Sequence, residues 1–587
     1  MMTQRINRRS QAAPGQAGRS LARIGTKRVL CLLLLLCAVG VSIWTTYVVS
    51  GNLFDSDTSS ELILGEKLAR EGGILSSSWY YSTELQVIDC QIVYALLFHL
   101  TSSWFLVRFW GAVIMQMMML GAFGFLARQA RIPFNRFCIA GAALLLPFSV
   151  PYGRIVLYHN YYSFYMIIAC LTVGAYLGFA RRVHASREGK RWPLWAFAGG
   201  LCLVSFLAGL GGVRQLMVCT APLLAASLLS ALVGERGEQS RLRAAWPELV
   251  GALAAFACSG IGYLVNLSAF AGVYSYTDYT GQYVAWSGIT KLDEIFRNLL
   301  ITLGFHDQSR LFTLFGLLGV CGLLIWLIAV LLGFHTLRNT ADPAARFLCV
   351  FMFMTQLVMT GVFMMLSLGE EYRMELYFLP AAFWIIPALG KADLRPDSGL
   401  PPEERKQAKT FRQRFFSGDA PLSVHGLVAI IALALLLANG CYYAAFFRDP
   451  GSYRDVTYNG LNYGDTDNVA GMRPIAEYLR ENEYTMAYAS YWDAAVITEL
   501  TDGQVKSLPV EVGRRKHPIQ YFDWLSDAKL RDPELIATKK AAVVANFDLA
   551  TELGEENQYG AVEVASFGGY TVFDLPNPAA LAEDLAK

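Results

Sequence analysis

The sequence predicts a polytopic α-helical membrane protein that ends in a small soluble α/β domain. Hydrophobic residues make up 54% of its 587 residues and charged residues only 16%, whereas soluble domains carry about 25% charged residues. The charges are also divided unequally along the chain. Residues 446–587 hold 13 Lys/Arg and 23 Asp/Glu, and residues 1–445 hold 36 and 24. These two observations indicate a basic membrane body followed by an acidic tail.

The apolar runs of the body predict about eleven transmembrane helices, because each span needs about 20 consecutive apolar residues. We expect the first to stay uncleaved, since its apolar run lacks a small-residue cleavage site. The run at 137–151 is the weakest of the set. The predicted spans are 29–49, 104–126, 137–151, 160–180, 194–212, 214–233, 247–270, 311–333, 347–368, 374–390 and 425–446.

The basic residues predict the orientation of these spans. Of the 36 in the body, 27 lie in the N-terminal tail and in alternate linkers, which the positive-inside rule assigns to the cytoplasm. An odd number of spans then places the tail on the outer side. The predicted organisation is a cytoplasmic basic tail at 1–28, a transmembrane domain at 29–446 and an extracytoplasmic α/β domain at 447–587. The expected location is the cell membrane.

The first outer loop, residues 51–103, predicts two helices that do not cross the membrane. Thr58–Arg70 is amphipathic, and the apolar stretch Val87–Leu100 is too short to span. We expect both to lie in the plane of the membrane interface. In the turn from Gly209 to Arg214, the glycines are expected to permit close backbone approach between two spans.

The tail alternates patterns of helical and strand period, which is typical of a small α/β domain. Nucleotide binding is not expected there, because no glycine-rich phosphate loop follows a predicted strand. The predicted helices are 473–483 and 492–500, and the predicted strands are 485–489, 505–510, 541–544 and a hairpin over 562–573 that turns at Gly568-Gly569.

Composition and spacing disfavour two classes of ligand. Nucleic-acid binding is not expected, because the basic residues lie between apolar runs and not on a soluble module. A dedicated metal site is not expected either, because the 11 cysteines and seven histidines form no CxxC or HExxH spacing. The cofactor remains unknown: a divalent metal is compatible with the sequence, but no residue pattern requires one.

Asp55 and Asp57 stand immediately after the first span, at the outer membrane surface. One interpretation is structural, with Asp57 or Thr58 capping the following helix and Glu61 in its first turn. The other is catalytic. The residue types alone do not separate these two interpretations.

Several short segments, read in order, resemble a known family. They are the carboxylate past the first helix, Thr58–Leu62 leading to Ala69 and Gly72, Trp104–Phe109 at the opening of the next span, Gly209–Leu216, and Glu370–Pro380. Together they resemble the membrane-embedded glycosyltransferases of the GT-C fold that use polyprenyl-phosphate sugars, such as protein mannosyltransferases and the aminoarabinose transferase of lipid A. The resemblance covers roughly residues 29–390. The family's usual Asp-Glu pair is Asp57-Thr58 here, and Arg373 is followed by Met374 where the family has Tyr.

The resemblance implies roles for particular residues. Asp57 is expected to be the general base, with Asp55 as the alternative, because an acceptor hydroxyl needs a carboxylate to take its proton. Arg214, Arg373 and Tyr372 are expected at the donor-lipid phosphate, where a guanidinium offers fixed donors to phosphate oxygens. The alternative for the arginines is an anchor at the lipid headgroups.

Four further residues are candidates for substrate binding. His159 and Asn160 have side chains that hydrogen-bond sugars, although an aromatic interface belt explains the surrounding tyrosines equally well. Glu370 and Glu371 are expected on the outer side, either at the acceptor site or as a solvated pair.

The predicted function is an integral-membrane glycosyltransferase that moves a sugar from a polyprenyl-phosphate or diphosphate donor to a cell-envelope glycan, lipid or protein on the outer face. Its other partners are membrane lipids. The alternative is a transporter or flippase of a lipid-linked glycan, for which the sequence shows no internal repeat. A third interpretation, a receptor domain on a membrane anchor, does not explain eleven spans.

Overall fold

The computed structural model describes most of the chain. The described residues are 14–82, 85–160, 162–185, 191–233, 241–270, 272–276, 292–305, 312–340, 342–365, 424–449, 457–458, 461–462, 468–512, 519–546, 549–550 and 559–585.

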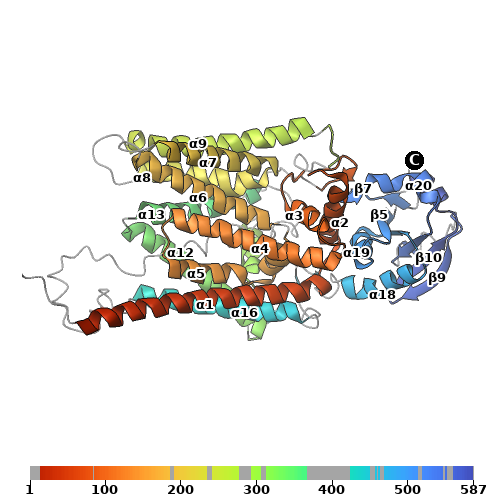
Figure 1. Ribbon diagram of the computed structural model, residues 1–587, viewed down its shortest axis with the longest axis horizontal. Helices are drawn as coiled ribbons and strands as arrows, with labels where there is room; N and C mark the ends of the chain where they lie inside the picture. Colours follow the sequence, from red (N-terminus) through yellow and green to blue (C-terminus); the bar gives the residue numbers. More distant parts are fainter. Residues whose placement is uncertain are drawn as a thin grey trace, which may run out of the picture.

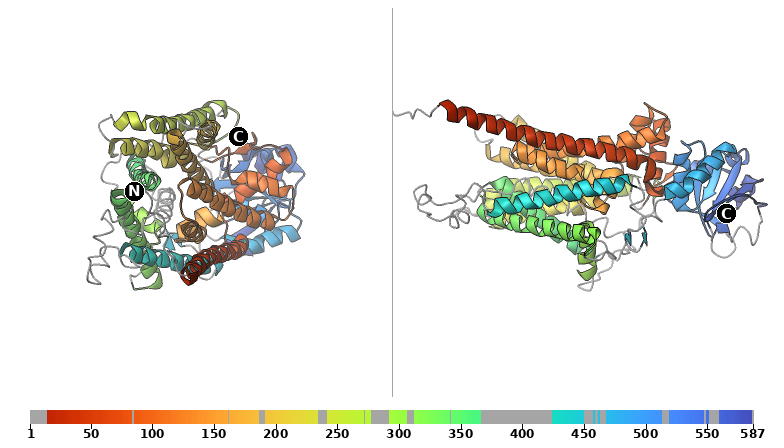
Figure 2. Two further views of the ribbon diagram at one scale, coloured as in Figure 1. Left: turned by 60° about the vertical axis from the view of Figure 1, so that its left-hand side comes forward. Right: turned by 90° about the horizontal axis from the view of Figure 1, so that it is seen from below.

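The described chain forms an elongated helical bundle with a small sheet domain at one end (Figures 1 and 2). Eight of its helices are long and apolar enough to cross a membrane. The helices that contain them are α1 (Pro14–Asn52), α4 (Trp104–Gln129), α6 (Ser163–Ala185), α7 (Trp192–Leu210), α9 (Arg241–Val265), α12 (Leu314–Asn339), α13 (Pro343–Met365) and α16 (Val424–Arg448).

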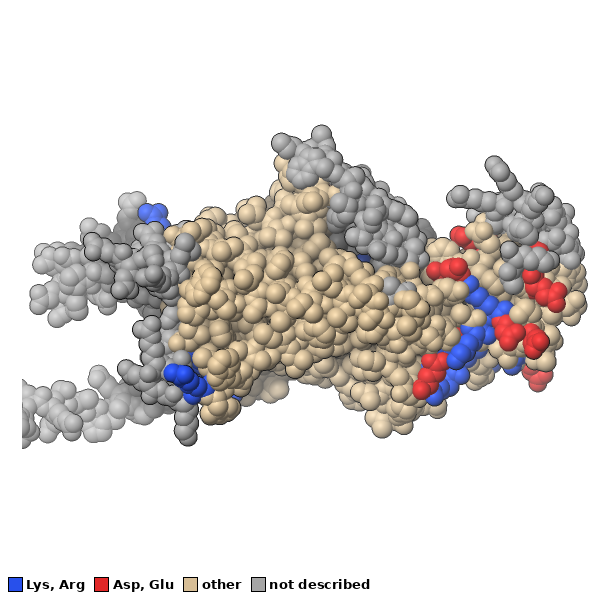
Figure 3. All heavy atoms as spheres, turned by 90° about the horizontal axis from the view of Figure 1, so that it is seen from above, with Lys and Arg blue, Asp and Glu red and all other residues tan. Residues whose placement is uncertain are grey.

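The surface of the bundle agrees with a membrane environment. In Figure 3 its described face is almost without charged side chains, and the charged residues gather near the two ends. Leucine, tryptophan and phenylalanine side chains are exposed along it, including Leu33, Trp44, Leu203 and Leu331. In water such a continuous apolar surface would be unfavourable, whereas in lipid it is the expected exterior.

The predicted count of eleven spans is not confirmed. The run at 137–151 forms only the 12-residue helix α5 (Phe134–Leu145), followed by the π-helical turn η1 (Tyr152–Tyr158). Pro147 follows that helix closely and cannot donate a backbone hydrogen bond to continue it. The run at 214–233 divides into η2 (Leu216–Thr220) and α8 (Ala221–Val233). The predicted span at 374–390 lies outside the described residues.

Buried polar side chains tie α1, α4 and η1 together within the bundle. Gln116 of α4 accepts a hydrogen bond from Ser42 at 2.9 Å and donates to Thr46 at 2.9 Å, both in α1. It also donates to the carbonyl oxygen of Leu157 in η1 at 2.8 Å. Interhelical hydrogen bonds of this kind help to hold membrane helices together. They fix η1 beside α1 and so position the segment that follows.

Glycines allow close backbone approach between α7 and α9, whereas the sequence predicted it between the two spans on either side of the Gly209–Arg214 turn. A Cβ atom on Gly209 would lie 1.9 Å from the carbonyl oxygen of Ser259 in α9. On the facing helix, a Cβ atom on Gly262 would lie 2.2 Å from the carbonyl oxygen of Phe206. Both distances are far below van der Waals contact, so α7 and α9 pack backbone to backbone at this point.

The C-terminal domain is built on a six-stranded mixed sheet with the order β6-β5-β4-β8-β10-β9. β4 is parallel to β5 and β8, and β10 is antiparallel to β8 and β9. The predicted helices and strands of the tail are confirmed. The sequence missed four short strands, β2, β3, β6 and β7, the 3₁₀ helix η7 and the last two helices. The bounds are α18 (Asn468–Glu481), β4 (Met486–Ala489), α19 (Tyr491–Leu500), β5 (Lys506–Val512), β6 (Ile519–Tyr521), β7 (Ser526–Asp527), α20 (Pro533–Ala537), β8 (Ala541–Ala545), β9 (Val562–Phe567), β10 (Tyr570–Leu575) and α22 (Pro578–Leu585). Short pieces β2 (Thr457–Tyr458), β3 (Leu461–Asn462) and the 3₁₀ helix η7 (Ala528–Arg531) accompany them.

The first loop contains α2 (Ser56–Glu71), β1 (Trp79–Tyr80) and α3 (Cys90–Phe98), and it lies between the bundle and the C-terminal domain (Figure 1). α2 packs against α3 and against α19, and β1 pairs antiparallel with β7 of the C-terminal domain. Even the polar residues Ser56, Ser59 and Lys67 of α2 are buried. The C-terminal domain therefore covers the polar face of α2, and the position of the two predicted helices in the plane of the membrane interface stays a prediction.

The α7–α9 contact predicts that Gly209→Ala destabilises the protein. The added methyl group meets the Ser259 carbonyl, and overpacking of this kind typically costs about 1–3 kcal/mol. Thermal unfolding of the detergent-solubilised protein measures the effect. Gly200→Ala on the same helix is the matched control, since a methyl group there would meet no neighbouring element within 4 Å. Equal melting temperatures for the two variants would contradict the proposed packing.

Candidate functional site

Asp55 fixes the start of α2. Its Oδ1 accepts a hydrogen bond from the Thr58 amide at 3.0 Å, and the Thr58 hydroxyl accepts one from the Asp55 amide at 3.0 Å. This reciprocal pair is a capping box. The expectation that Asp57 or Thr58 caps the helix is therefore wrong: Asp55 is the cap, and Thr58 is its partner one turn later.

The second carboxylate oxygen of Asp55 holds the bundle. Oδ2 lies 2.6 Å from Nη2 of Arg154 in η1 and 3.7 Å from Nδ1 of His159. Asp55 itself is 7% exposed. One oxygen of Asp55 thus caps α2 and the other holds the helix against η1, which is a structural arrangement.

Asp57 lies in the first turn of α2 and faces the C-terminal domain. Its Oδ1 accepts a hydrogen bond from the hydroxyl of Tyr491, the first residue of α19. Burial and the nearby charge of Asp55 raise the pKa of Asp57 to about 7, although the Tyr491 hydrogen bond and the charge of Arg154 oppose the shift. A carboxyl group with this pKa exchanges its proton near neutral pH.

Two further carboxylates extend the site toward α3. Glu61 lies one turn after Asp57, and burial followed by the charge of Asp57 raises its pKa to about 7. Asp89 caps α3, accepting from the Cys90 amide at 2.7 Å, and burial followed by the charge of Glu61 raises its pKa. Cys90 also lies with its Sγ 3.9 Å from Glu61 Oε2.

We call Asp57, Glu61 and Asp89 the acidic cluster. Neither Glu61 nor Asp89 was predicted as a site residue. For Glu61 the available signal was its spacing of four residues from Asp57, which places both on one helix face. For Asp89 the signal was its position just before a short apolar helix, but nothing in the sequence shows that α3 lies beside α2.

Arg214, a predicted phosphate ligand, lies in the turn between α7 and η2. Its Nη1 donates to the hydroxyl of Tyr162 at 2.5 Å, and its guanidinium lies 5.4 Å from the centre of that ring. Its positive charge lowers the pKa of Asp89 against the effect of burial. Its charge thus acts on one carboxylate of the acidic cluster, and its role at the donor phosphate stays a prediction.

His159 and Asn160, predicted to bind sugar, are both buried. Asn160 has a φ of 64° and donates from Nδ2 to the hydroxyl of Tyr94 at 3.4 Å. Asparagine tolerates this left-handed conformation better than most residues. These contacts stabilise the turn between η1 and α6, so the sugar-binding role of both residues stays a prediction.

The remaining candidates, Glu370, Glu371, Tyr372 and Arg373, lie outside the described residues. Within the described part of the chain, no group of three or more His, Cys, Asp or Glu side chains is arranged to hold a metal ion.

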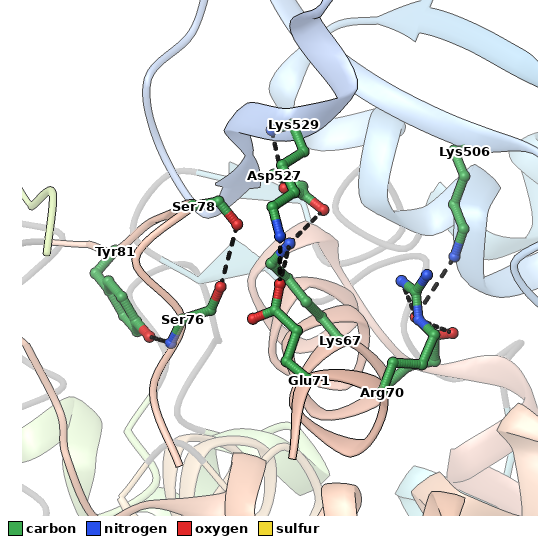
Figure 4. A network of polar contacts seen from close by, with 10 residues as sticks. Lys67, Arg70, Glu71, Ser76, Ser78, Tyr81, Lys506, Asp527 and Lys529 are labelled. Atoms are coloured by element: carbon green, nitrogen blue, oxygen red, sulfur yellow. Dashed lines mark hydrogen bonds and ion pairs between the residues drawn. The ribbon is translucent and has the colours of Figure 1, made fainter. Parts of the chain in front are cut away.

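A belt of ion pairs fastens the C-terminal domain to α2 (Figure 4). Buried Lys67 lies 2.8 Å from Asp527 and 3.2 Å from Glu71, and Lys529 lies 2.9 Å from the same glutamate. Elsewhere on α2, Glu66 lies 3.6 Å from Lys506. Because these pairs join the loop to the domain, α2 is held from both sides.

Comparison with known proteins gives distant structural matches. No family model matches the sequence, and a search of curated proteins gives no match. The chain is similar to the Archaeoglobus fulgidus oligosaccharyltransferase in its apo form, with 12% identity, a TM-score of 0.46 and coverage of 95% of this chain and 77% of that one. For the same enzyme tethered to an acceptor peptide with the NVT sequon, the identity is 12%, the TM-score 0.43 and the coverage 92% and 74%.

A third match is the arabinofuranosyltransferase AftD from Mycobacteria, with 13% identity, a TM-score of 0.41 and coverage of 92% of this chain and 40% of that one. With TM-scores below 0.5, these matches assign neither an activity nor a substrate to this chain.

The two roles of Asp55 predict a large loss of stability in Asp55→Ala. The substitution removes an N-cap, worth about 0.5–2 kcal/mol, and also leaves the partly buried Arg154 without its carboxylate, so we expect about 2 kcal/mol or more. Asp532→Ala is the matched control, because Asp532 is an exposed cap of α20. Thermal unfolding of both variants checks the expectation, and an Asp55→Ala protein as stable as the control would contradict it.

Proposed function

We propose that this protein is an integral-membrane glycosyltransferase that moves a sugar from a polyprenyl-phosphate or diphosphate donor to a cell-envelope acceptor on the outer face. The observation that carries the proposal is Asp57, a carboxylate of near-neutral pKa at the end of a bundle of membrane-length helices. A general base works best when its pKa lies near the working pH.

The contacts of the two loop aspartates favour Asp57 as the base. Asp55 commits one oxygen to the helix cap and the other to Arg154. Asp57 is only partly buried, and its hydrogen bond to Tyr491 involves Oδ1. Asp57 therefore keeps a surface toward an incoming hydroxyl group, and Asp55 positions the helix that carries it.

The proposed reaction follows from these positions. The acceptor oxygen attacks the anomeric carbon of the sugar while its proton passes to the carboxylate of Asp57. The bond between that carbon and the phosphate oxygen breaks, and the lipid phosphate leaves with its negative charge. Arg214, together with Arg373 from the sequence, is proposed to stabilise that charge, as guanidinium groups do for phosphate.

The proposed site lies on the outer side of the membrane. Most basic residues of the body fall in the N-terminal tail and alternate linkers, and this asymmetry supports a cytoplasmic location for those segments. The first loop and the C-terminal domain are then extracytoplasmic. A transporter would bind its lipid-linked substrate near the middle of the bilayer. By contrast, the acidic cluster belongs to α2 and the start of α3, which lie at the end of the bundle next to the C-terminal domain (Figure 1).

We predict that Asp57→Asn reduces sugar transfer by about 10²- to 10⁴-fold, since this is the usual contribution of a general base. Asparagine keeps the size of the side chain and its hydrogen bond with Tyr491 but cannot take the proton. The measurement is transfer of labelled sugar from a polyprenyl phosphate by the purified full-length protein. Asp532→Asn is the control. If Asp57→Asn retains transfer and Asp55→Asn does not, the base is Asp55; if both retain it, the catalytic proposal is wrong.

We also predict that Arg214→Ala weakens binding of the donor lipid about tenfold or more, because charge-assisted hydrogen bonds contribute about 1.5–3 kcal/mol each. Arg214→Lys should restore binding only in part, since an ammonium group lacks the paired donors of a guanidinium. Binding of labelled polyprenyl phosphate is measured directly. Arg70→Ala is the control, because Arg70 is an exposed arginine of α2 in the first loop that pairs with Glu66. Equal affinity in the Arg214→Ala and Arg70→Ala proteins would show that Arg214 does not bind the donor phosphate.

A further inference from the structure

Tyr491 belongs to the C-terminal domain, yet its hydroxyl group donates a hydrogen bond to Asp57 of the first loop, 434 residues earlier in the chain. We propose that Tyr491 is a positioning residue for the catalytic carboxylate, so that the C-terminal domain forms part of the active site. This inference rests on the proposed function of Asp57 and assigns the domain a role in it.

The tyrosine is itself held in place. Its backbone carbonyl accepts a hydrogen bond from the hydroxyl of Ser56, the neighbour of Asp57. Its ring packs against Phe522 and Trp492, with centroid distances of 5.1 Å and 5.2 Å. A donor fixed at both its backbone and its ring holds the carboxylate in one orientation, which is what a reacting group requires.

The helix that carries Tyr491 is joined to the membrane body. At its other end, Glu499 forms a buried ion pair with Arg108 of α4. The amide of Trp104, at the start of α4, donates to Asp502 at 3.2 Å. Phe54, which lies just before α2, is buried within the hydrophobic core of the C-terminal domain. The relative position of Tyr491 and Asp57 is therefore set by contacts on three sides.

The hydrogen bond has a chemical consequence for Asp57. The titratable and charged groups that face this carboxylate are Asp55 and Glu61 of the same loop, Arg154 of η1, and the neutral Tyr491 hydroxyl of α19. Tyr491 in turn faces Asp57, Asp55 and the indole of Trp524. A donor to the ionised form of a carboxylate lowers its pKa, so loss of the hydroxyl group raises the pKa of Asp57 further.

The first test is the pH dependence of transfer in Tyr491→Phe. Because the base acts when deprotonated, we expect the rising limb of the pH–rate profile to move upward by about half a unit to one unit, as the loss of one hydrogen bond implies. The rate then falls at neutral pH and recovers at higher pH. Tyr559→Phe is the matched control, since it removes a tyrosine–aspartate hydrogen bond with Asp584 elsewhere in the same domain.

Two results would overturn the proposal. One is a profile that does not move, and the other is an equal loss of rate at every pH, which indicates a purely structural contact. If Tyr491→Phe fails to fold, 3,5-difluorotyrosine at position 491 keeps the ring and the hydroxyl and makes it a stronger donor. The limb should then move to lower pH, and an unmoved limb again overturns the proposal.

A second measurement separates this inference from the proposed function. Infrared titration of the full-length protein follows the carboxyl stretch of Asp57, assigned by its loss in Asp57→Asn. If the wild-type protein transfers no sugar but Tyr491→Phe moves this titration upward, the proposed function fails and the positioning contact stands. If the titration is the same in both proteins, Tyr491 does not position Asp57, whatever the activity.

Discussion

The ion pair between Asp55 and Arg154 is the constraint on which the candidate site depends. One oxygen of this carboxylate caps α2 and the other holds η1, so a single side chain sets both the start of the helix and its place against the bundle. With the start fixed, the helical repeat directs Asp57 toward α19 and Glu61 toward Cys90 of α3. Substituting the cap would therefore disturb the site without removing any reacting group.

The C-terminal domain is a second wall of the same site. A loop helix at a membrane surface would normally show water its polar face, but here that face is covered by α19 and fastened by Lys67 and its acidic partners. Removal from water is the main cause of the raised pKa values of Asp57 and Glu61. The C-terminal domain thus affects the pKa values of the loop carboxylates by covering the loop as well as by contacting it directly.

Much of the architecture could be predicted from local patterns in the sequence. Apolar runs of span length and the alternating periods of the tail found most of the helices and strands, because these signals lie within about 20 residues. The sequence predicted a full span where the short helix α5 lies, because the apolar run continues past the proline that follows this helix. The sequence could not tell which of Asp55 and Asp57 caps α2, because this depends on the exact first residue of the helix, which periodicity does not give. The contacts of Asp57 with Tyr491 and of Arg108 with Glu499 join residues about 400 positions apart and leave no local signal.

We propose that the donor phosphate and the acceptor meet between Arg214 and Asp57, at the end of the bundle covered by the C-terminal domain. Cryo-electron microscopy of the full-length protein in lipid nanodiscs, with a non-transferable polyprenyl-phosphonate sugar bound, tests it most directly. The account predicts the phosphonate within hydrogen-bond distance of Arg214 and the anomeric carbon facing the carboxylate of Asp57. A lipid headgroup bound at the opposite end of the bundle, or on a surface remote from the acidic cluster, would contradict it.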